Sequence, residues 1–135
     1  MNNNRFRAAA DVSHTMRAEL LRMFPPRLSR VFCKSITMAY NVTNEFAFPT
    51  DMTDATVYAI HRSEEHEALL IAVAGDKRRP DGSRFFLTLS TAPGVAPVKA
   101  GEIHASQVEA VERGVVFGVQ FQLYPLWQQQ PEMAG

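Results

Sequence analysis

The feature that most constrains this fold is a strict alternation of side-chain type near the end of the sequence. Every second residue from position 115 to 123 is apolar, and the residues between them are mixed; the apolar set is Val115, Phe117, Val119, Phe121 and Leu123. A period of two is typical of a strand that presents one face to a core. Pro125 cannot donate to a sheet and ends the run. We therefore predict a strand over residues 115–124.

Four earlier segments also have the patterns of strands. They cover residues 35–42, 56–62, 68–74 and 84–90. The run at 68–74 is continuously apolar, which predicts a central strand that is covered on both faces. Strands and helices do not alternate along the chain as they do in a parallel sheet, so we expect an antiparallel sheet of about four to six strands.

The N-terminal region predicts one long helix. Apolar residues recur there at three- and four-residue steps between about residues 5 and 23, and the two prolines that follow cannot continue a helix. Arg7 and His14 would lie on the face of the helix that meets water. We expect this amphipathic helix to pack on one face of the sheet through four apolar side chains, namely Phe6, Met16, Leu20 and Phe24.

A second, shorter helix is expected before the last strand. Ser106 and Glu109 have the spacing of a capping box, in which the serine caps the third amide of a helix and the glutamate reaches back. A helix from about 107 to 113 would then end at Gly114, in the usual C-terminal position of glycine. With the strands, the two helices predict the α+β fold class.

Length and composition favour one small domain. The chain has 135 residues, of which 46% are hydrophobic and 21% are charged, as is ordinary for a globular protein. We expect a single domain over residues 1–127 and a disordered tail over 128–135. The single cysteine, Cys33, excludes an internal disulfide and fits a reducing compartment. No apolar run approaches the roughly 20 residues of a membrane span, so we expect a cytoplasmic protein without membrane contact.

The charge is unevenly distributed although the net charge is zero. Residues 1–34 contain seven basic side chains and two acidic ones, so the rest of the chain is acidic. A basic segment is the minimum requirement for nucleic-acid binding. No aromatic residues are interleaved with the basic ones in the pattern of a stacking surface, and a solvated basic face explains the charges equally well.

A second basic cluster lies in the stretch "GDKRRPDGSRFF", between two predicted strands. Its basic side chains are Lys77, Arg78, Arg79 and Arg84. The sequence Pro80-Asp81-Gly82 is typical of a tight turn, so we expect a hairpin tip rather than a phosphate-binding loop, which would lead into a helix. Phe86 falls on the strand face that would be wet, which predicts that the helix or a second protomer covers it. These four basic residues and Phe86 are the predicted binding residues.

No pattern in the sequence identifies a catalytic or metal site. His61 and His66 are five residues apart, which does not place them on one face of a helix or a strand, so we expect no metal ion and no cofactor. His61 and His104 both begin an H-x-S triplet, and paired triplets of this kind occur in phosphoesterases that use two histidines as acid and base. Cys33 lies next to Lys34 but has no histidine nearby in sequence, which favours a buried structural thiol.

These observations predict a small, non-enzymatic binding protein that acts through a protein–protein surface, as an inhibitor, adaptor or assembly factor. Apolar side chains on strand faces that should be wet support such a surface. We also expect a homo-oligomer, with a dimer preferred, formed by the uncharged strand 115–124 or by the face around Phe86. A second possible function is a phosphate- or nucleic-acid-binding module that uses the 77–84 tip and the basic N-terminal region. A third is a small phosphoesterase-like enzyme with His61 and His104.

Overall fold

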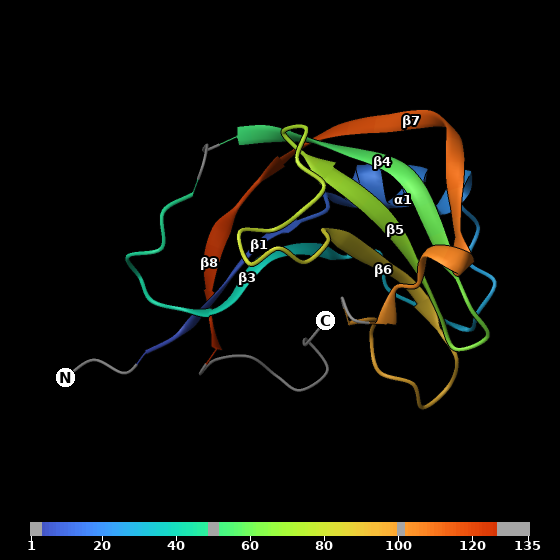
Figure 1. Cartoon of the computed structure of the whole chain (residues 1–135), viewed down its shortest axis with the longest axis horizontal. Coiled ribbons are helices and arrows are strands. Elements are labelled where there is room, and N and C mark those ends of the chain that lie inside the picture. Colours follow the sequence, from blue (N-terminus) through green and yellow to red (C-terminus); the bar gives the residue numbers. More distant parts are fainter. Residues whose placement is uncertain (1–3, 49–51, 100–101, 127–135) are drawn as a thin grey trace.

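The computed structural model describes residues 4–48, 52–99 and 102–126, and these residues form two antiparallel sheets and one α-helix (Figure 1). The elements, in chain order, are β1 (Phe6–Asp11), α1 (His14–Met23), β2 (Arg30–Val31), β3 (Ser35–Val42), β4 (Met52–Arg62), β5 (His66–Val73), β6 (Phe86–Thr91), the 3₁₀-helix η2 (Ala105–Gln107), β7 (Val108–Gln120) and β8 (Gln122–Pro125). The antiparallel sheet and the α+β character expected from the sequence are confirmed, but the strands divide between two sheets.

The two sheets wrap around a common core, and the chain passes directly from one sheet to the other at two edges. The smaller sheet has the strand order β3-β1-β8, and the larger has the order β2-β6-β5-β4-β7. Phe121 connects β7, at the edge of the larger sheet, to β8, at the edge of the smaller one. On the other side of the molecule β3 lies close to β6, although the two strands do not pair. On this side residues 32–34 run from β2 into β3, and the amides of Phe32 and Cys33 donate to carbonyls of β6. Beyond this link a seam remains between β3 and β6.

The strand patterns of the sequence correspond to the observed burial. In β7 and the residue after it, Phe117, Val119 and Phe121 are buried in the core, as the alternation predicts. All eight residues of β5 are buried, so this strand is covered on both faces. The alternation fails at one place, because Tyr40 on β3 is 65% exposed instead of facing the core.

The predicted helix at 5–23 is wrong in its first half. Residues Phe6–Asp11 form the central strand of the smaller sheet, and the helix begins only at His14, where the Ser13 hydroxyl accepts a hydrogen bond from the Met16 amide. Ala8, Ala9 and Ala10 are fully buried in this strand. Alanine favours a helix in isolation, but pairing with two distant strands overrides that propensity. In α1, Leu20 is buried and Met16 and Phe24 pack against the core as predicted, whereas Phe6 belongs to β1.

The predicted helix at about 107–113 is also wrong. Only Ala105–Gln107 form a single 3₁₀ turn, and Val108 already begins β7. The strand pairs with β4 on both sides of Gly114, so the glycine is an interior strand residue rather than a helix end. A capping box requires a following helix, and here the ladder with β4 satisfies the backbone instead.

Phe86 is covered, but by its own chain. Its exposed fraction is 9%, and it packs on the outer face of the larger sheet with Val98, from the loop that follows β6. The prediction that α1 or a second protomer covers Phe86 is therefore not needed. The expected tail at 128–135 lies outside the described residues. Within the described ranges, no helix has the length and apolar character required to span a membrane.

Candidate functional site

The candidate site lies on the outer side of the seam between β3 and β6. Strand alternation decides which side chains face it. On β3, Ile36 points into the core while its neighbours Ser35 and Thr37 point outward. On β6, Leu87 points into the core and Thr88 points outward. The outward side chains of the two strands therefore line the walls of one notch.

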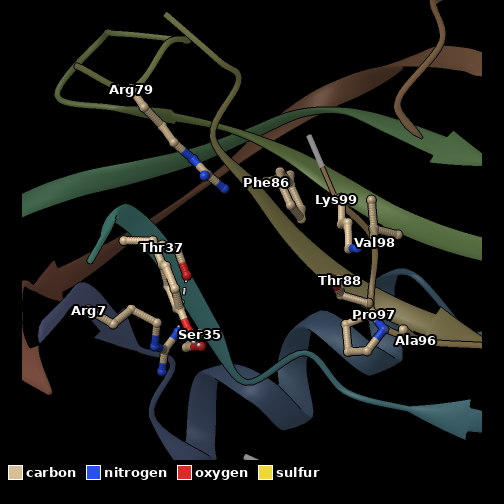
Figure 2. A pocket seen from close by; sticks show the side chains of 11 residues that line it. Arg7, Ser35, Thr37, Arg79, Phe86, Thr88, Ala96, Pro97, Val98 and Lys99 are labelled. Carbon is tan, nitrogen blue, oxygen red and sulfur yellow. Dashed lines mark hydrogen bonds between the residues drawn. The ribbon is translucent and has the colours of Figure 1, made fainter. Parts of the chain in front are cut away.

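A cavity of about 440 Å³ occupies this notch (Figure 2). Two segments outside the sheets close it: the hairpin tip supplies Arg79, and the loop after β6 supplies the run from Ala96 to Lys99. The lining is mainly apolar and includes three cationic side chains; the complete set is Arg7, Ser35, Thr37, Tyr40, Arg79, Phe86, Thr88, Ala96, Pro97, Val98 and Lys99. The volume is in the range that holds a small organic ligand.

Arg7 is the most deeply placed of the three cations. It lies on β1 and is 7% exposed, and its Nη1 donates to Ser35 Oγ at 3.1 Å and to Thr37 Oγ1 at 3.0 Å. The Tyr124 ring lies against the guanidinium, with 5.5 Å between Cζ and the ring centroid. Its Nε is buried without a hydrogen-bond partner. The strand and these contacts hold the positive charge in one place.

Arg79 approaches the cavity from the opposite side, and Figure 2 shows it pointing between Thr37 and Phe86. Its Cζ lies 5.0 Å from the centroid of the Phe86 ring. Burial lowers the pKa of this guanidinium, and the nearby Asp81 carboxylate partly opposes the shift. The turn predicted from the sequence positions it, since the Gly82 amide donates to the Arg79 carbonyl and Gly82 has a φ of 90°.

The cavity places these charges beside an apolar wall, and no acidic residue is among the residues that line it. Lys99 is exposed at the rim, and Val98, which is 5% exposed, packs beside Phe86. Among the residues that the structure describes, no carboxylate forms an ion pair with Arg7, Arg79 or Lys99. Buried guanidinium groups are normally paired. The site is therefore suited to a ligand that brings negative charge.

The structure separates the basic cluster that the sequence identified. Arg79 and Phe86 line the notch cavity, whereas Lys77, Arg78 and Arg84 line another hollow, of about 180 Å³, together with Tyr58. There the Lys77 ammonium lies 4.6 Å from the centroid of the Tyr58 ring. Burial raises the pKa of Tyr58, and Arg84 and Arg78 oppose the shift. The tip is thus divided between two surfaces.

Several residues of the cavity are not predicted by the sequence. Its pattern places Arg7 on the wet face of a helix, and it gives no reason to select Thr37, Thr88 or Lys99. The seam between β3 and β6 brings these residues together from four separate segments. The one available signal is the strand alternation at 35–42, which places Thr37 on the outward face.

The histidines form a cluster of their own at the other end of the larger sheet. His61 is fully buried, both of its ring nitrogens have no hydrogen-bond partner, and its ring stacks on His66 at 5.3 Å between centroids. Burial lowers the pKa of His61, and the nearby His66 and His104 lower it further. His66 Nε2 lies 3.6 Å from Glu102 Oε2. No group suited to a metal ion occurs among the described side chains.

Cys33 is a buried thiol in this structure. Its side chain is fully buried in the core, and burial raises its pKa to about 11. A thiol with a raised pKa holds its proton at neutral pH and is a poor nucleophile. These properties agree with the structural interpretation of Cys33.

Comparisons of this chain with protein-family models, with curated proteins and with solved structures find no match.

Proposed function

We propose that this protein binds a small organic anion with an apolar body in the notch cavity between β3 and β6. The observation that carries the proposal is a pair of guanidinium groups, buried on Arg7 and partly buried on Arg79. They share a largely apolar cavity, and neither forms an ion pair with a carboxylate of the described residues. An anion would neutralise them, and its apolar part would replace water against Phe86 and Val98.

The arrangement provides both affinity and selectivity. Hydrogen bonds between guanidinium and an oxyanion are about twice as strong as those between neutral groups, and they are stronger still where water is excluded. A cation would meet three positive charges in the same cavity and would be repelled. A small neutral ligand would leave the two guanidinium groups unpaired. The same lining therefore favours organic anions over both neutral and cationic molecules.

A direct test is a thermal-shift and calorimetry screen of the purified protein with matched sets of small aromatic anions, amides and amines. We expect the anions, but not the amides or amines, to raise the melting temperature of the protein. Ligand concentrations up to about 10 mM are used, because small ligands of this kind can bind weakly. Arg79→Gln should remove the effect, and Arg84→Gln, which changes a neighbouring arginine outside the cavity, should not. Equal stabilisation by amides, or equal loss in the two variants, would contradict the proposal.

A second candidate function is protein–protein binding, with self-association as its simplest form. β7 is an edge strand of the larger sheet, its stretch from Val115 to Gln120 contains no charged residue, and Val116 is 59% exposed. Unprotected edges of this kind favour pairing with another chain. Sedimentation velocity tests the proposed homodimer: Val116→Lys should dissociate it, and a wild-type monomer at tens of micromolar would exclude it at that concentration.

Nucleic-acid binding and phosphoesterase activity have less support in the geometry. A phosphate- or nucleic-acid-binding role would use the hollow of Lys77, Arg78 and Arg84 as its contact surface. A phosphoesterase would require His61 to reach a substrate, but His61 is fully buried. Residence in the cytoplasm is part of the proposal and follows from the single thiol and the expected absence of membrane contact.

A further inference from the structure

We propose that the ligand of the notch cavity is an elongated dianion, with two negative groups at opposite ends of an apolar body. This inference depends on the proposed function, since it names the class of anion that the same cavity takes. It rests on the placement of Arg7 and Arg79, which reach the cavity from different segments of the chain, and on the apolar side chains that line the cavity beside them (Figure 2).

One cationic end is the Arg79 guanidinium. It points into the cavity and makes no hydrogen bond to any described residue, and only its Nε is buried without a partner. Its two terminal nitrogens therefore remain available as a fork, which matches the two oxygens of a carboxylate. The Phe86 ring supports the guanidinium from one side, so its orientation is defined before a ligand arrives.

The other cationic end combines Arg7 with the hydroxyl of Thr37. Thr37 Oγ1 accepts its hydrogen bond from Arg7, so its own hydroxyl hydrogen can be donated to a ligand oxygen. Arg7 stays behind this hydroxyl as a largely buried positive charge. Figure 2 shows this group at the β3 wall, apart from the side chain of Arg79. A second negative group at this wall would be held by charge and by a directed hydroxyl.

The cavity also has an apolar wall beside these two groups. Phe86 and Val98 pack together in a cluster on the outer face of the larger sheet, and Ala96 and Pro97 extend this wall. A cavity of about 440 Å³ is much larger than a single phosphate or carboxylate group. A ligand with charge only at its ends satisfies both cationic walls and leaves its middle against the apolar side chains.

The test uses four probes that share one aromatic ring: terephthalate, with a carboxylate at each end; benzoate, with one; phenyl phosphate, with both charges at one end; and benzamide, with none. Affinities are measured by calorimetry with the full chain at slightly alkaline pH. We expect terephthalate to bind at least about tenfold more tightly than benzoate or phenyl phosphate, which corresponds to one additional charge-assisted pairing. Benzamide should not bind.

The outcomes separate this inference from the proposed function. If phenyl phosphate or benzoate binds as tightly as terephthalate, the two-ended ligand is wrong while anion binding stands. If none of the three anions binds, both the two-ended ligand and the proposed anion binding are wrong.

Protein variants assign the two ends. Arg79→Gln should reduce terephthalate affinity about tenfold, to the level of benzoate, with Arg84→Gln as the control on the same hairpin. Substitution of Arg7 endangers folding, so Thr37→Val tests the second end instead. This variant should bind terephthalate several-fold more weakly. Its affinity for benzoate should be almost unchanged, because benzoate is expected to pair with Arg79. Equal losses for both ligands in Thr37→Val would overturn the second end.

Discussion

The notch cavity and the surroundings of Glu67 differ in whether their buried charged side chains form ion pairs. Glu67, on β5, is 1% exposed, and its carboxylate is fully partnered: it pairs with Arg62, accepts a hydrogen bond from the Ser90 hydroxyl at 2.6 Å and accepts another from the Arg27 amide at 2.9 Å. In the notch, neither Arg7 nor Arg79 forms an ion pair with a carboxylate of the described residues, although Asp81 lies near Arg79.

The difference indicates which charges hold the fold together and which are available to a ligand. The Glu67 network joins β4, β5, β6 and the segment before β2, so its charges are part of the folded structure. Removal of one partner from a buried charge network is strongly destabilising, whereas a buried charge without an ion-pair partner is a candidate for ligand recognition. On this basis the Glu67 network is structural and the notch is the proposed binding site.

The largest expected effect is the loss of stability when the Glu67 network is broken. Glu67→Ala should lower the free energy of unfolding by about 3 kcal/mol or more, because Arg62, the Ser90 hydroxyl and the Arg27 amide lose their common partner. Urea denaturation measures the change. Glu64→Ala, at an exposed position two residues before β5, is the matched control and should stay within about 0.5 kcal/mol. If Glu67→Ala lowers the free energy of unfolding by less than about 1 kcal/mol, the Glu67 network does not stabilise the fold as expected.

The next effect concerns His61, a buried ionisable group whose two ring nitrogens have no hydrogen-bond partner. Its pKa is lowered in the folded protein by burial and by His66 and His104, with Glu102 opposing. As the pH falls below about 6.5, the ordinary pKa of histidine, His61 becomes protonated in the unfolded chain but stays neutral in the folded protein. Stability contributed by neutral His61 is therefore complete above that pH and is lost in acid, with a slope of at most about 1.4 kcal/mol per pH unit.

This pH dependence is measured by urea denaturation between about pH 7.5 and pH 5. His61→Phe should reduce the acid-induced loss of stability, whereas His14→Gln, at an exposed position on α1, should leave it as in the wild type. An unchanged pH profile in His61→Phe would show that His61 is not the group responsible.

A smaller effect is expected for the unliganded notch. Arg79→Gln should change the free energy of unfolding by less than about 1 kcal/mol, because loss of the contact with Phe86 is offset by removal of a partly desolvated charge. With terephthalate present, the wild type should gain stability by mass action and the variant should not. If, without ligand, Arg79→Gln lowers the free energy of unfolding as much as Glu67→Ala does, the Arg79 guanidinium has a structural role. The two regions then do not differ in the function of their charges.

The smallest effect is expected for the tip residues that lie outside the notch. Changing Lys77 and Arg84 together to glutamine should alter stability by less than about 0.5 kcal/mol, since neither forms an ion pair among the described residues. Terephthalate affinity should change by less than about threefold, through long-range charge alone. A tenfold loss of affinity in this double variant would show that the hollow around Tyr58 and the notch act as one site.

Local patterns in the sequence determined five strand segments, at 35–42, 56–62, 68–74, 84–90 and 115–124, and the turn at the hairpin tip. The alternation from Val115 to Phe121 predicts which side chains enter the core, because successive side chains of a strand point to opposite faces wherever it pairs. The continuous apolar run in β5 predicts burial on both faces. Pro80 and Gly82 favour the turn through their own backbone preferences. None of these features depends on a distant partner.

The tertiary structure alone decided the first strand and the site. Ala8 to Ala10 are compatible with a helix or a strand, and only pairing with β3 and β8, far away in sequence, selects the strand. That pairing turns Arg7 from a solvated helix residue into a buried charge beside Thr37. The seam between β3 and β6 then brings it into one cavity with Arg79, Phe86 and Lys99. Contacts between distant segments create this site, so the pattern of any one segment does not contain it.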